Sequence, residues 1–125
     1  GNIMNIEIDL AKKIIIGKIS HIDTHYSESH FTYYSITNGD YFVWCYSNNA
    51  WVNVKTLPDD LIDLDSLEKD LFYIVESEGR KAFSDEQSRY ENPYPKQSVL
   101  FDGWDVGWQA LAAINEPSFS DSVPR

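Results

Sequence analysis

Two glycines lie inside a tryptophan-rich helical segment near the C-terminus, and they restrict the possible folds more than any other feature. Gly103 and Gly107 are about one helical turn apart, and each is followed directly by a tryptophan, Trp104 or Trp108. A glycine inside a helix lowers its stability by about 1 kcal/mol relative to alanine, so two of them need a packing reason. We therefore expect a helix over residues 97–114 whose small residues admit another helix closely or form a groove for a partner.

An earlier helix and a proline-bounded turn are predicted ahead of this segment. Apolar residues recur at helical spacing over residues 66–83, interrupted only by Glu78. Asp65-Ser-Leu-Glu68 has the form of a capping box at the start of that helix. Asn92-Pro93-Tyr94-Pro95 is expected to fix the turn, because proline restricts the backbone. The two helices and the turn predict a helical hairpin.

Three elements of this hairpin resemble a known family. Gly79-Arg-Lys-Ala82, Asn92-Pro93-Tyr94 and Trp104-Asp-Val-Gly107-Trp108 occur in the order seen in the ribosome modulation factor family, short bacterial and phage proteins. The resemblance covers residues 79–111, and Glu86 stands where the family usually has a second glycine. It implies a helical hairpin and a partner related to translation. We expect structural roles for six residues of this segment: Gly79, Ala82, Asn92, Pro93, Gly103 and Gly107.

The first half of the chain is predicted to form an antiparallel sheet. Alternating or β-branched patterns predict about five strands, over residues 5–10, 13–22, 31–37, 41–46 and 50–55. Asn38-Gly39 supplies a tight hairpin turn and Ser47-Asn48-Asn49 another. The expected fold class is α+β, an antiparallel β-meander followed by the helical hairpin. We expect a sheet region at residues 4–57, a helical region at 58–116 and a tail at 117–125, with sheet and helices in one compact domain.

Negative charge is concentrated in the second half of the chain. Residues 1–57 contain five acidic and four basic residues, whereas residues 58–125 contain fifteen acidic and six basic residues. An acidic surface repels phosphate backbones, so direct nucleic-acid binding is not expected. The complementary partner is a basic protein or the protein surface of a ribonucleoprotein.

Composition adds few further constraints. The sequence has no apolar run near the roughly 20 residues that a membrane span requires. Cys45 is the single cysteine, so an intramolecular disulfide is impossible. We expect a cytoplasmic protein without a cofactor.

A histidine cluster is the feature that most resembles a catalytic or metal site. If residues 19–25 are extended, His21, Asp23 and His25 point to one face, and two imidazoles with a carboxylate can bind zinc or iron. The alternative is an exposed polar loop at a strand end.

Aromatic residues are more numerous than so small a core can bury, which favours a protein interface. The sheet candidate is Trp44, on a strand that is aromatic on both faces. The candidates in the hairpin are Tyr94, Asp102, Trp104, Asp105 and Trp108.

These observations favour a small, acidic, non-enzymatic bacterial or phage protein that modulates or inhibits a basic protein or ribonucleoprotein. Three alternatives are open. The first is a toxin-neutralising immunity protein or phage anti-defence inhibitor that acts as a nucleic-acid decoy. The second is a small metal-dependent enzyme using His21, Asp23 and His25. The third is an assembly subunit whose aromatic residues serve self-association.

Overall fold

The computed structural model describes residues 6–115, and the chain divides into two compact units. Unit 1 comprises residues 1–69 and unit 2 comprises residues 70–125; the boundary lies within helix α2 (Leu64–Ser84). It differs from the predicted division at 57/58 because a strand and the first turn of α2 belong with the sheet. The predicted tail at 117–125 lies outside the described residues.

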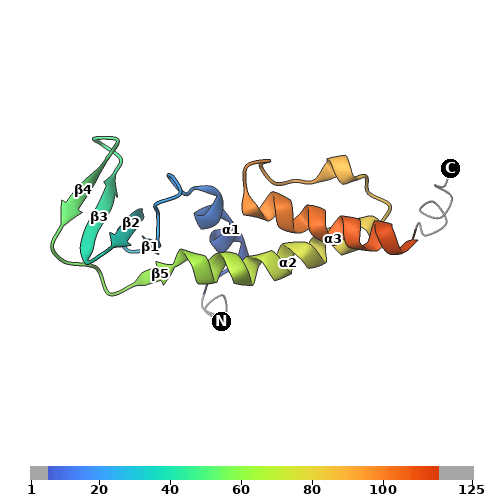
Figure 1. Cartoon of the computed structure of the whole chain (residues 1–125), viewed down its shortest axis with the longest axis horizontal. Helices are drawn as coiled ribbons and strands as arrows, with labels where there is room; N and C mark the ends of the chain where they lie inside the picture. The colour runs from blue at the N-terminus through green and yellow to red at the C-terminus, as the bar shows by residue number, and fades with distance from the viewer. Residues whose placement is uncertain (1–5, 116–125) are drawn as a thin grey trace. The chain divides into compact units, whose positions relative to one another are not determined.

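Unit 1 contains a five-stranded antiparallel sheet, which confirms the α+β class (Figure 1). The strands are β1 (His25–Ser27), β2 (Thr32–Thr37), β3 (Asp40–Cys45), β4 (Ala50–Val54) and β5 (Leu61–Asp63). β1 to β4 form a meander and β5 returns to pair with the other side of β1, so the strand order is β4-β3-β2-β1-β5.

The two N-terminal strands predicted over residues 5–10 and 13–22 are wrong. The structure instead has helix α1 (Ile8–Ile16), followed by turns up to β1. Ala11, Ile14 and Ile15 are buried, which is the spacing of one helix face, and β-branched residues do not prevent a helix when tertiary packing favours it. The two further strands of the sheet, β1 and β5, lie in segments outside the five predicted strands.

The predicted turns of the meander are confirmed. Asn38 and Gly39 have φ of 50° and 84°, the positive values of a two-residue hairpin turn between β2 and β3. The Ser47–Asn49 segment lies in the turn between β3 and β4, where Asn49 has φ of 54°. These turns set the register of the three longest strands.

The side chains of unit 1 alternate between two faces of the sheet. One face carries Tyr26, Tyr33, Phe42, Trp44 and Trp51, as the strand register requires. The ring centroids of Tyr26 and Tyr33 are 4.8 Å apart, in an edge-to-face arrangement. The Tyr33 hydroxyl donates to the Ile14 carbonyl at 2.6 Å, which joins α1 to this aromatic face.

Unit 2 is a helical hairpin of α2 and α3 (Val99–Asn115), joined by a segment that contains the short 3-10 helix η2 (Arg89–Glu91) (Figure 1). Both helices lie within two residues of their predicted bounds at each end. The predicted cap differs: the Asp63 carboxylate, not that of Asp65, accepts the backbone N–H groups of Asp65 and Ser66, at 3.0 and 3.4 Å. Asp63 satisfies donors that the first helical turn leaves free.

The two helices approach through their glycines. A Cβ placed on Gly79 would lie 1.9 Å from the Trp104 carbonyl oxygen, and one on Gly103 would lie 2.5 Å from Val75 Cγ2. A real Cβ does not fit at such distances, so these positions require glycine in this packing. Of the two roles considered for Gly103 and Gly107, the structure gives them close helix packing.

Asn92 holds the connecting segment in place. Its side-chain amide donates to the Phe101 carbonyl at 3.0 Å, and its side-chain oxygen accepts the Tyr94 backbone N–H at 3.1 Å. Ala82 is buried in α2, whereas Pro93 is exposed. The turn is therefore maintained by a local side-chain bridge in addition to the proline geometry.

Candidate functional site

The hairpin tryptophans have structural contacts that limit their use in partner binding. Only 3% of Trp104 is exposed, so the prediction that it contacts a partner directly is wrong. Trp108 is half-buried, its ring packs edge-to-face on Phe83 at 5.2 Å, and its indole N–H donates to the Gln87 carbonyl at 2.9 Å. Trp108 therefore joins α3 to the C-terminal end of α2 and to the segment that follows it.

The polar candidates of the hairpin are also largely engaged within unit 2. The Tyr94 hydroxyl donates to the Glu78 carboxylate. Asp105 accepts two bonds from the Arg89 guanidinium, at 2.9 and 3.1 Å, and this contact raises the pKa of Arg89. Asp102 is exposed and is the one candidate of the hairpin that faces solvent.

Trp44 lies in a different environment, an open aromatic cluster in unit 1. Its ring packs edge-to-face on Trp51 at 5.4 Å and on Tyr46 at 6.4 Å. Trp44 and Trp51 are directly opposite each other on β3 and β4, and both are only half-buried. Half-buried aromatic clusters provide large contact areas at low entropic cost, so this cluster is a better candidate surface than the hairpin.

An apolar hollow of about 390 Å³ lies on the same face of the sheet. Phe42 and Trp51 from the strands and Ile22 from the loop after α1 supply its apolar lining. The remaining lining residues are polar and come from the same loop and from β2: His21, Thr24, Ser35 and Thr37. A mainly apolar hollow with a few polar groups at its margin is typical of a binding site.

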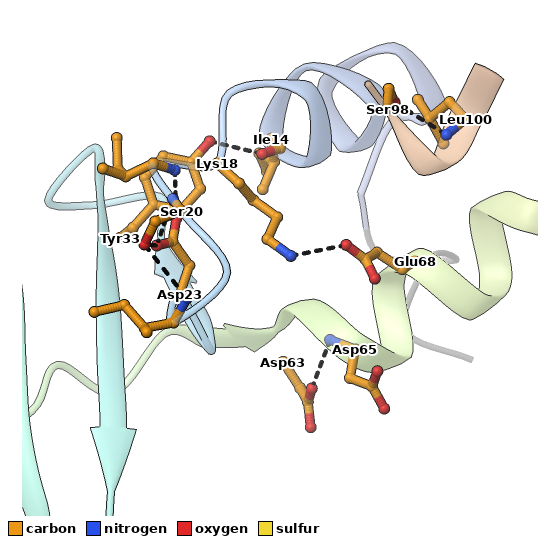
Figure 2. A network of polar contacts seen from close by, with 12 residues as sticks. Ile14, Lys18, Ser20, Asp23, Tyr33, Asp63, Asp65, Glu68, Ser98 and Leu100 are labelled. Atoms are coloured by element: carbon orange, nitrogen blue, oxygen red, sulfur yellow. Dashed lines mark hydrogen bonds and ion pairs between the residues drawn. The ribbon is translucent and has the colours of Figure 1, made fainter. Parts of the chain in front are cut away.

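A second, acidic hollow of about 430 Å³ adjoins the first, because His21 and Thr24 line both. Its acidic lining consists of Asp23, Asp63, Asp65 and Glu68, and its basic lining of Lys18. Figure 2 shows Lys18 reaching Glu68, an ion pair of 2.9 Å between half-buried side chains. The lining therefore retains an excess of negative charge beside an apolar surface.

Asp23 holds the segment between the two hollows. Its carboxylate accepts the backbone N–H of Ile19 at 2.6 Å and that of Ser20 at 3.1 Å, and only 5% of the residue is exposed (Figure 2). Residues 19–22 consequently form a turn, and the extended geometry on which the metal-site hypothesis depended is absent there.

The histidines of the predicted metal site line the acidic hollow together with Asp23, but they are not grouped with its carboxylate as metal ligands. His21 is exposed in the turn, whereas His25 lies in β1 with its Nδ1 atom 2.7 Å from Thr24 Oγ1. Within residues 6–115, no three histidine, cysteine, aspartate or glutamate side chains are grouped as metal ligands. These three residues are better explained by local structure: Asp23 closes a loop that contains His21, and His25 begins β1.

Asp60 joins the segment before β5 to the end of β1 and the turn that follows it. Its carboxylate accepts from Ser27 Oγ at 2.8 Å and from the Ser29 backbone N–H at 2.7 Å. These hydrogen bonds lower the pKa of Asp60, and the one donated by the backbone N–H of Ser29 is the largest cause. The sequence pattern around Asp60 does not indicate these bonds, since its partners lie about 30 residues earlier.

Phe42, Trp51 and Ile22 are the site residues that sequence reasoning did not select. The period-two alternation of β3 places Phe42 and Trp44 on one face, and this signal was available. The position of Ile22 could not be predicted in this way, because it depends on the turn that Asp23 closes. The chain matches no protein-family model, no curated protein and no solved structure.

No helix among residues 6–115 is long and apolar enough to cross a membrane.

Proposed function

We propose that this chain is a non-enzymatic binding protein that recognises a basic protein and modulates or inhibits it through unit 1. The observation that carries this proposal is the apolar hollow beside Phe42 and Trp51, joined at His21 and Thr24 to an acidic hollow. A partner segment with apolar and cationic side chains is complementary to both.

The apolar hollow supports direct contact. Aromatic side chains that are half-buried in the free protein lose much of their remaining exposed area when a partner covers them. Each 100 Å² of apolar surface buried in this way contributes about 2.5 kcal/mol before the costs of association. Ile22 is 42% exposed at the rim, so it is available to the same contact.

The acidic hollow and the net charge of −10 support the basic character of the partner. Complementary charge mainly increases the association rate and excludes acidic competitors. Its effect on the final affinity is smaller. The interaction is therefore expected to weaken as the salt concentration rises.

Two versions of the partner follow from the sequence. The hairpin's resemblance to the ribosome modulation factor family supports a ribonucleoprotein, and co-sedimentation with ribosomes at moderate salt tests that version. The exposed acidic residues support a second version, in which the protein presents carboxylates where a nucleic acid would bind and so inhibits its partner, as immunity and anti-defence proteins do. Competition between this protein and a nucleic acid for the captured partner tests the second version.

The experiment is affinity capture of partners from bacterial lysate at low and moderate salt, with matched variants. Ile22→Ser alters the apolar hollow and Asp65→Asn the acidic one. Ile114→Ser and Asp102→Asn make the same exchanges at exposed positions of unit 2. All variants are first checked for native circular dichroism.

We expect one basic partner that the wild type and both unit 2 variants retain at low salt. The Ile22→Ser and Asp65→Asn variants should lose it. If the unit 2 variants lose the partner instead, the binding surface lies on the hairpin. Recovery of no specific protein by the wild type would contradict the proposed function.

A further inference from the structure

We propose that β4 is an interface for a second copy of this chain, which pairs with it antiparallel and joins two sheets into one. This proposal does not rest on the proposed function. β4 is an edge strand, and among residues 6–115 no other strand pairs with its outer side (Figure 1). An edge strand presents unpaired backbone N–H and C=O groups and is a template for another strand.

The register of the meander identifies which groups of β4 face outward. Thr37 and Asp40 flank the two-residue turn and form its hydrogen-bonded pair, and such pairs alternate along antiparallel strands. Val43 therefore exchanges backbone bonds with Val52 of β4, its partner in the register. It follows that Trp51 and Asn53 direct their backbone N–H and C=O groups away from β3.

A two-fold axis through Val52 pairs these outward groups completely. Trp51 of one copy is then opposite Asn53 of the other, and each such pair exchanges both backbone hydrogen bonds. The two Val52 side chains meet at a non-hydrogen-bonded position, where Cα atoms are about 4.5 Å apart. Val52 is 39% exposed in the single chain, so its pairing would bury apolar surface.

The charge pattern favours a second copy over a charged partner at this edge. Residues 41–58 contain one charged side chain, Lys55, in a chain with 30 acidic and basic residues. The edge is therefore neutral on an acidic protein, and in the proposed register Lys55 is opposite Asn49. Within Ala50–Val54 itself there is no lysine or proline, and the continuous register with β3 has no bulge, so this strand lacks the features with which natural edge strands prevent pairing.

The arrangement has a consequence for the aromatic face. A two-fold axis perpendicular to the sheet leaves Trp51 of both copies on the same face. The two apolar hollows would then open to the same side of one continuous sheet.

The test is the molar mass of the full chain, measured by light scattering and sedimentation over a range of concentrations. We expect the mass to rise from 14.4 kDa towards twice that value. V52K and V52E should each be monomeric, with a dissociation constant raised about tenfold or more, because like charges would lie directly opposite. An equimolar mixture of the two should dimerise again, and V52T should dimerise like the wild type.

Amide hydrogen exchange provides a second readout that a change in folding would not mimic. Protection of the Trp51 and Asn53 amides should increase with protein concentration, while that of Val52 should remain constant. A wild type that stays monomeric at its highest soluble concentration would overturn the proposal. So would a dimer that V52K and V52E leave intact, because it would use another surface.

Discussion

Gly107 of α3 lies directly against the backbone of Glu76 in α2, so closely that a Cβ on Gly107 would be 1.9 Å from the Glu76 carbonyl oxygen. Gly79 makes the reciprocal contact with the backbone of Trp104. Because the obstructing atoms are backbone, they cannot rotate away as a side chain would. The hairpin can keep this spacing only with glycine at both positions.

Gly107→Ala is therefore expected to destabilise unit 2, although alanine is the better helix former. Overpacking typically costs 1–3 kcal/mol, and contact with backbone places this change at about 3 kcal/mol. Urea unfolding of the full chain measures it. Val106→Ala, at an exposed position of the same helix, is the control and should change stability by less than about 0.5 kcal/mol. Equal stability of the Gly107→Ala variant and the wild type would show that the helices can separate without loss.

Glu86→Gly should stabilise the protein. Glu86 has φ of 64°, the left-handed conformation that glycine adopts without strain. Its N–H donates to the Phe83 carbonyl and that of Gln87 to the Ala82 carbonyl, both at 2.9 Å, which is the pattern of a glycine-terminated helix. We expect a gain of about 1 kcal/mol in the free energy of unfolding. Ser84→Gly, inside the same helix end, should instead lower stability by a similar amount.

Tyr33→Phe should weaken the attachment of α1 to the sheet. Tyr33 is 3% exposed, and its hydroxyl supplies the 2.6 Å bond to the Ile14 carbonyl. Removing the donor leaves a carbonyl without this partner, with an expected loss of about 1–2 kcal/mol in chemical denaturation. Tyr46→Phe is the matched control on the exposed part of the same face. If both variants have wild-type stability, the hydroxyl of Tyr33 does not contribute to the attachment.

Asp60 should make unit 1 sensitive to acid. Hydrogen bonds from Ser29 and Ser27 lower the folded-state pKa of Asp60 below its ordinary value of 3.8. The stability it contributes is thus fully present above the ordinary pKa and is lost as the pH falls through the lowered folded-state value. Thermal melts from pH 6 to about pH 2 should show a steeper acid loss for the wild type than for Asp60→Asn. Parallel curves for the two proteins would rule out this role.

Much of the helical hairpin could be predicted from the sequence. Its apolar spacing, its proline-bounded turn and its glycine pairs are local signals, and the helix bounds follow from them to within two residues. Two of the residues predicted to contact a partner in the same unit are instead engaged within the protein. Trp104 is buried and Asp105 is paired with Arg89, and neither contact is visible from residue type alone.

The N-terminal segment shows the opposite case. Ile14, Ile15 and Ile16 have strong strand preferences, yet they belong to a helix whose buried face includes Ala11 and Ile14. A short run of β-branched residues is compatible with a helix or a strand. In the helical form, the Ile14 carbonyl accepts a hydrogen bond from Tyr33, which lies nineteen residues later in the chain.

By itself, the sequence determined the α+β class, the meander turns and the glycine-dependent hairpin, because these depend on local backbone preferences and on the periodicity of apolar residues. Tertiary structure decided which face of the sheet carries the open aromatic cluster, how Asp23 folds the loop beside it and which carboxylates are already bonded. Those properties depend on contacts between residues far apart in the chain, and a pattern of neighbouring residues does not encode them.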